Sequence, residues 1–184
     1  MTMNAPTLPR LSTRALVPAA VFALTACAHP KAVDVPAALQ PTAAESLSMI
    51  VAARGVQIYE CRAPASDAAA AAAWTFVAPD AELFDENGRS IGHHGAGPFW
   101  QLADGSRIVG TVKARAEAPV TGAIPWLLLA TQANGPQGRL SPVTSVLRVN
   151  TAGGTAPTLG CSRDKDGARA RVIYTADYHF FSPR

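Results

Sequence analysis

The sequence predicts an all-β fold: a single antiparallel domain, either a β-sandwich or a partly open β-barrel, over residues 45–184. Three observations predict it. Short segments alternate in side-chain character, most clearly residues 172–180. The continuous apolar run at residues 124–131 has the length of a strand buried on both faces. Glycines and prolines, 14 and 15 of the 184 residues, break the chain into short pieces, which is typical of sandwiches and barrels.

The first expected strands follow residue 45, on either side of Gly55. Two alternating sets indicate them: Leu47, Met49 and Val51, then Val56 and Ile58. A short helix over residues 42–53 is the alternative, because Thr42-Ala43-Ala44-Glu45 has the form of a capping box.

Two short strands are expected next, at residues 74–77 and 82–84, on either side of Pro79. Residues 85–88 (Asp-Glu-Asn-Gly) predict a tight turn, because Asn-Gly readily accepts positive φ. The return strand is expected to begin at Ile91.

The second half of the domain carries four more expected strands. A turn at residues 104–105 precedes residues 107–113, and the buried run at 124–131 is followed by a strand at 143–149. The last strand has the clearest alternation. One of its faces carries Val172, Tyr174, Ala176, Tyr178 and Phe180; the other carries Thr175, Asp177 and His179.

The N-terminal segment has the pattern of a bacterial lipoprotein signal peptide over residues 1–26. Arg10 and Arg14 precede a short apolar stretch, and Leu24-Thr25-Ala26 leads directly to Cys27. A cysteine after such a cut carries lipid, so Cys27 is the predicted lipidation site and the link to a membrane. Two or more acyl chains are needed for a stable anchor.

Residues 27–44 are expected to form a flexible tether, because three prolines, Pro30, Pro36 and Pro41, interrupt regular structure. An extended first strand is the alternative for this segment. The predicted location is the bacterial cell envelope, facing the periplasm. Ala28 after the lipidated cysteine favours the outer membrane.

The charge balance excludes one class of partner. The chain has 16 basic and 13 acidic residues, a net charge of +3, and two of the basic residues lie in the signal segment. The remaining body is nearly neutral and shows no basic cluster, so nucleic acid is not an expected partner.

Cys61 and Cys161 remain once Cys27 is assigned to lipid. Two cysteines outside the cytoplasm most simply pair, so a disulfide that closes a loop of about 100 residues is expected. Two unpaired buried thiols are the alternative.

A set of ordered motifs resembles one known family. The motifs lie at residues 55–61 (Gly-Val-Gln-Ile-Tyr-Glu-Cys), 74–85, 94–100 (His-x-Ala-Gly-Pro-x-Trp), 104–106 (Asp-Gly-Ser), 124–129 (Ile-Pro-Trp-Leu-Leu-Leu), 148–154 (Arg-x-Asn-Thr-x-Gly-Gly) and 174–180 (Tyr-x-Ala-Asp-Tyr-x-Phe). Over residues 45–181 the chain resembles the domain of unknown function 3455 family of secreted and envelope proteins. The resemblance implies no established activity or cofactor. Gly95 departs from it, since the family often has an aromatic residue there.

The leading functional hypothesis is a non-catalytic module that binds a small molecule or a protein partner. Aromatic residues could line a ligand pocket, although such residues more often fill a core. Three residues are the predicted pocket walls: His94, Trp100 and Asp104. A purely structural envelope protein is another hypothesis.

A hydrolase is the catalytic alternative. Ser90 stands in the pattern Gly88-x-Ser-x-Gly92, which resembles a nucleophile elbow, but the following glycines do not favour the helix that an elbow needs. Asp177 and His179 share one strand face, where a carboxylate could orient an imidazole as a base. His93 and His94 are expected on opposite faces of a strand, so a metal site is not predicted. The sequence has no Gly-x-Gly-x-x-Gly after a strand and no βαβ pattern to hold a dinucleotide, so no cofactor is predicted.

Overall fold

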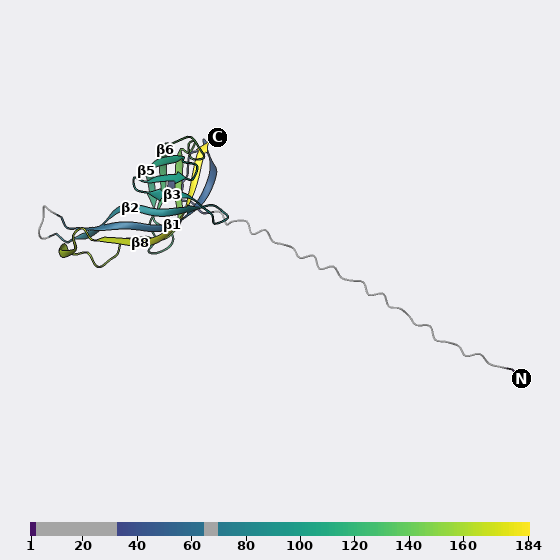
Figure 1. Ribbon diagram of the computed structural model, residues 1–184, viewed down its shortest axis with the longest axis horizontal. Coiled ribbons are helices and arrows are strands. Elements are labelled where there is room, and N and C mark those ends of the chain that lie inside the picture. Colours follow the sequence, from purple (N-terminus) through teal and green to yellow (C-terminus); the bar gives the residue numbers. More distant parts are fainter. Residues whose placement is uncertain (3–32, 65–69) are drawn as a thin grey trace. The chain divides into compact units, whose positions relative to one another are not determined.

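Eight antiparallel strands form a closed barrel in the computed structural model, which describes residues 1–2, 33–64 and 70–184 (Figure 1). The strands are β1 (Glu45–Arg62), β2 (Ala73–Phe84), β3 (Ser90–Gly95), β4 (Phe99–Leu102), β5 (Arg107–Ala116), β6 (Trp126–Ala133), β7 (Ser145–Gly153) and β8 (Arg169–Pro183). Each strand pairs with its neighbours in sequence, and β8 pairs with β1 to complete the ring. The all-β prediction is confirmed; of its two forms the fold is the barrel, and that barrel is closed.

Most of the predicted signal segment, and Cys27 with it, lies outside the described residues. No helix in the part of the chain that the structure describes is both long and apolar enough to cross a bilayer.

Inward-facing side chains fill most of the barrel. The predicted inner face of β8 is confirmed, since Tyr174, Ala176, Tyr178 and Phe180 are all buried. They pack with buried residues of the other strands: Val51, Ala53, Ala81, Leu83, Trp100, Leu102, Ile108, Leu129 and Val146. At one end of the barrel, Leu140 and Val143 from the β6–β7 connection join this core.

A second, smaller core lies on the outer face of β6 and β7. It consists of Trp126, Leu128, Leu147 and Val149, together with Leu39 from the short 3-10 helix η1 (Ala37–Leu39). This cover explains why β6 is apolar on both faces, as its sequence predicts. We call residues 33–40 the strap. Leu39 is fully buried, so the packed body begins ahead of residue 45, where the sequence predicts its start.

The Thr42–Glu45 pair makes one of the two contacts of a capping box, and no helix follows it. The Glu45 carboxylate accepts hydrogen bonds from the Thr42 backbone N–H (3.0 Å) and hydroxyl (2.9 Å). The chain then continues as β1, because β8 and β2 pair along its two edges. The helix alternative for residues 42–53 is therefore wrong.

The turn at residues 85–88 forms as its sequence predicts. Gly88 adopts φ 73°, and the Asp85 carboxylate accepts hydrogen bonds from the backbone N–H groups of Asn87 and Arg89. These contacts direct the chain back along β2 as β3.

Three strands continue past the barrel as an arm, visible beyond the ring of strands in Figure 1. The arm comprises residues 59–62 of β1, 73–76 of β2 and 169–172 of β8. The predicted Cys61–Cys161 disulfide is confirmed, with its Cα atoms 5.3 Å apart. It joins the end of β1 to the β7–β8 connection, so it fastens that connection to the arm.

Candidate functional site

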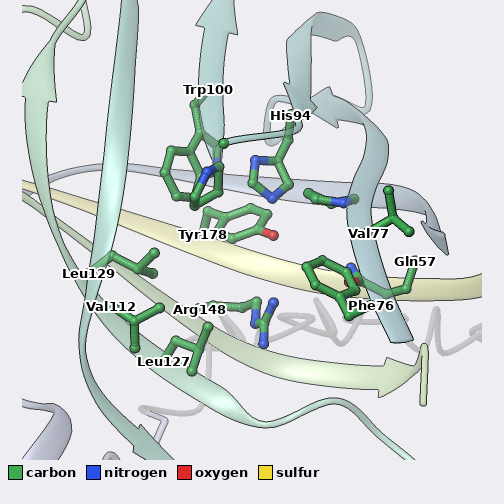
Figure 2. A pocket seen from close by; sticks show the side chains of 13 residues that line it. Gln57, Phe76, Val77, His94, Trp100, Val112, Leu127, Leu129, Arg148 and Tyr178 are labelled. Carbon is green, nitrogen blue, oxygen red and sulfur yellow. The ribbon is translucent and has the colours of Figure 1, made fainter. Parts of the chain in front are cut away.

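A pocket of about 170 Å³ lies where β1 and β2 leave the barrel for the arm, since Gln57, Phe76 and Val77 line it. Figure 2 shows the side chains that line the pocket. Its lining is mostly apolar and comes from β2, β4, β5 and β6: Phe76, Val77, Pro79, Trp100, Val112, Leu127 and Leu129. Val112 and Phe76 are also about half exposed, so they lie where the pocket meets solvent.

Stacked rings form one wall of the pocket. The His94 imidazole lies against Trp100, with ring centroids 4.6 Å apart and planes inclined by 18°. Tyr178 meets Trp100 edge to face at 5.3 Å. Gly110 on β5 leaves the space that Trp100 needs, because a Cβ atom at that position would lie 2.9 Å from the indole ring.

His94 is held as a neutral acceptor. Its Nδ1 lies 2.7 Å from the Phe99 carbonyl oxygen. A carbonyl only accepts, so Nδ1 carries the proton and Nε2 keeps a free lone pair. Burial lowers the pKa of His94 to about 3, although the bond to Phe99 opposes the shift. The imidazole therefore brings no positive charge to the pocket at neutral pH.

Arg148 supplies the positive charge of the site. Its Nε and Nη2 donate hydrogen bonds to the Pro125 carbonyl at 3.1 and 2.8 Å, which fixes the guanidinium beside the pocket and leaves Nη1 uncommitted to that carbonyl. Burial raises the pKa of Tyr178, while the positive charge of Arg148 acts in the opposite direction. Burial also raises the pKa of Tyr174, so both phenols are protonated at neutral pH.

Gln57 is an unusual lining residue. It lies on the inner face of β1 and is only 2% exposed. Its side chain lies near enough to Tyr174 to oppose the rise in the pKa of that phenol, but no acceptor among the described residues is within hydrogen-bonding distance of its amide nitrogen. A buried donor without an acceptor costs about 1–3 kcal/mol. The pocket therefore presents at least one donor that the protein itself does not satisfy.

The structure brings together two of the three predicted pocket residues. His94 and Trp100 both line the pocket. Asp104 lies beyond the opposite end of β4. Its carboxylate accepts hydrogen bonds from the Ser106 backbone N–H and hydroxyl and from the Arg139 backbone N–H. It thereby ties the β4–β5 turn to the β6–β7 connection, away from the pocket lining.

The polar pocket residues Gln57, Arg148 and Tyr178 are absent from the sequence-based site. A signal for them exists in the two-residue period of the strands. Gln57 shares its face of β1 with Val51 and Ala53, and Arg148 lies two residues after the buried Val146. A polar residue at an inward position of an apolar strand face marks a candidate binding group.

The hydrolase residues do not form a catalytic arrangement. Ser90 opens β3 and donates its hydroxyl to Glu82, so it stands on a strand and not on a strand-to-helix turn. On the outer face of β8, Asp177 accepts a hydrogen bond from the Asn150 side-chain amide at 2.7 Å. Burial lowers the pKa of His179, and Asp177 only opposes that shift.

His93 and His94 diverge, as their adjacent positions on a strand predict. The His93 side chain is half exposed and its Nε2 lies 3.6 Å from an Asp80 carboxylate oxygen, whereas His94 is buried. Within the described residues, no three His, Cys, Asp or Glu side chains come together as a metal site would require.

The fold and site define a closed up-and-down barrel of eight strands, built from the described residues, with a small apolar pocket at one end. The chain belongs to the family described as Protein of unknown function (DUF3455), whose sequence model matches residues 41–182. This match covers all the pocket-lining residues. Comparisons with curated proteins and with solved structures found no match.

Proposed function

We propose that this protein is a non-catalytic binding module of the bacterial cell envelope that holds a small molecule in the barrel-end pocket. One observation carries the proposal: an apolar pocket, walled by stacked rings, contains a buried amide nitrogen without a protein acceptor. Ligand sites characteristically combine apolar walls with a few fixed polar groups. A ligand acceptor would offset the cost of the unpaired donor.

Access and rigidity also support binding. The exposed Val112 and Phe76 give a ligand a route from solvent. Trp100 and His94 are held by packing and by the Phe99 carbonyl, so the wall is formed before a ligand arrives. A preorganised site loses little conformational entropy on binding.

The envelope location rests on the sequence pattern around Cys27 and on the disulfide. Disulfides persist mainly in oxidising compartments such as the periplasm, so the Cys61–Cys161 bond supports export. Acyl chains on Cys27 would anchor the exported protein to the membrane, and the outer membrane is the favoured one.

The binding proposal is tested by blocking the pocket mouth. In a ligand-observed NMR screen of small aromatic and aliphatic compounds, we expect the wild-type protein to bind several and the Val112→Trp variant to lose them. Val120→Trp is the matched control, because Val120 is 54% exposed against 52% for Val112 and lies outside the pocket lining. No compound bound, or equal binding by Val112→Trp, would contradict the proposal.

Acylation has its own test. Cells that produce the full chain should incorporate labelled palmitate into it, and the Cys27→Ala variant should carry no label and leave the membrane fraction. Equal fractionation of both forms, with no label in either, would refute the anchor while leaving the pocket untouched.

A further inference from the structure

The pocket has room for about one ring. Its volume is about 170 Å³, and a dry protein cavity of about 150 Å³ is known to hold benzene. Drug-sized molecules occupy sites of about 300–1,000 Å³. A second ring would have to lie outside the pocket, at its exposed mouth beside Phe76 and Val112.

The walls favour an aromatic ring. Trp100 and His94 present a stacked pair, and Tyr178 stands at an angle to both rings. Leu127 and Leu129 on β6 supply apolar contact from another strand (Figure 2). Aromatic rings gain edge-to-face and offset-stacked contacts that a saturated ring of the same size does not.

The polar groups favour an anion. Arg148 takes part in none of the ion pairs found among the described residues, although its guanidinium lines the pocket. The Gln57 amide nitrogen adds a donor without a partner. A carboxylate offers two acceptor oxygens, and charge-assisted bonds to a guanidinium are roughly twice as strong as neutral ones.

We infer that the pocket takes a single-ring aromatic carboxylate, with the ring beside Trp100 and His94 and the carboxylate on Arg148 and Gln57. This inference rests on the proposed function and narrows it to one chemical class. The free Nε2 lone pair of His94 would accept a hydrogen bond from a hydroxyl group on the ring.

The test compares acids with neutral analogues by isothermal titration calorimetry. Benzoate is the probe, benzyl alcohol removes the charge, and cyclohexanecarboxylate removes the aromaticity. We expect wild-type protein to bind benzoate at least about tenfold more tightly than either analogue. Equal affinities for benzoate and benzyl alcohol would overturn the assignment of a carboxylate.

Variants assign the charge recognition to one residue. Arg148→Gln should weaken benzoate binding at least about tenfold and change benzyl alcohol binding by less than about threefold. Arg115→Gln is the charge-matched control, because Arg115 is exposed on β5 and outside the pocket lining. An equal effect of both substitutions, or equal loss of both ligands in Arg148→Gln, would contradict the inference.

A second variant keeps the test decisive if Arg148→Gln does not fold. Gln57→Leu removes the other donor and leaves the contact of Arg148 with Pro125 in place, and it should weaken benzoate binding more than benzyl alcohol binding. If neutral compounds bind in the pocket as well as acids do, the ligand class is wrong and the proposed function stands. If no compound binds, the proposed function itself fails.

Discussion

Gln57, His94 and Arg148 each occupy a position that faces the pocket, on strands whose other inward residues are largely apolar. Burying such groups costs free energy unless hydrogen bonds compensate. The hydrogen bond to the Phe99 carbonyl offsets the burial cost of His94, and the hydrogen bonds to the Pro125 carbonyl offset part of the burial cost of Arg148. Gln57 keeps an unpaired nitrogen. At the scale of single residues, the pocket therefore combines apolar walls with a buried amide whose nitrogen is unpaired.

His94 gives a prediction about pH. The pKa of its imidazole is lowered from 6.5 to about 3. Near pH 6 the imidazole therefore binds a proton in the unfolded chain but stays neutral in the folded chain. Stability should therefore fall as the pH drops below 6.5, by about 2 kcal/mol between pH 7 and pH 5 from this group. Urea unfolding at the two pH values measures the loss.

The His94→Asn variant tests whether His94 causes this loss of stability at low pH. Its side-chain amide can still donate to the Phe99 carbonyl, but it does not titrate, so its stability should depend less on pH over the same interval. The same loss of stability in wild type and variant would show that His94 is not responsible.

The sequence was enough to predict two lining residues of the pocket, His94 and Trp100, because they are close along the chain and paired across adjacent strands. His94 on β3 and Trp100 on β4 lie opposite each other, and the Gly-Pro turn between the two strands already indicates that they come together. Asp104 is only four residues from Trp100, yet it lies past the far end of β4. Closeness along the chain does not say which end of a strand a residue reaches. Arg148 is far away in sequence and joins the pocket only through strand pairing.

At the scale of elements, the strap covers apolar surface that the barrel alone would expose. Trp126, Leu128 and Leu147 point outward and need this cover. Three prolines in residues 27–44 suggest a flexible tether, but they do not prevent extended chain from packing, since proline removes a donor and not apolar contact. The alternating strands were predictable because their two-residue period is local; the strap has no such period.

Leu39 should contribute most of the strap's stabilisation. Leu39→Ala removes a fully buried side chain and should lower the free energy of unfolding by about 2–4 kcal/mol. Leu47→Ala is the matched control, because Leu47 is 50% exposed, and it should cost less than about 0.5 kcal/mol. Denaturant unfolding compares the two. Similar small losses would mean that the strap does not stabilise the barrel.

The disulfide should stabilise the fold without shaping the pocket. Cys61 and Cys161 are separated by 100 residues in sequence, and the double variant Cys61→Ala/Cys161→Ala should be about 2–4 kcal/mol less stable than wild type. Its affinity for a pocket ligand should stay close to that of wild type, because neither cysteine lines the pocket. Loss of binding in a variant that remains folded would show that the disulfide helps to hold the lining residue Phe76 in place.

At the scale of the whole molecule, closure of the barrel depends on β1 and β8, which meet along a register that runs from Glu45 and Pro183 to Glu60 and Arg169. The sequence predicts strands and turns, but it leaves sandwich and barrel open, because only this pairing of the first and last strands distinguishes them. Closure also creates the pocket, since its lining combines residues of β1, β4, β7 and β8.

The three tryptophans offer the most direct test of the central claim, that the barrel end binds a small molecule. Trp100 lines the pocket, and Trp126 lies in the second core on the outer face of β6 and β7. Trp74 lies on the arm, and its indole N–H donates a hydrogen bond to the Leu159 carbonyl. In a titration of ¹⁵N-labelled protein with benzoate, the indole N–H signal of Trp100 should move while that of Trp126 stays in place. A Trp100 signal that does not respond, or one that moves no more than the Trp126 signal, would contradict the account.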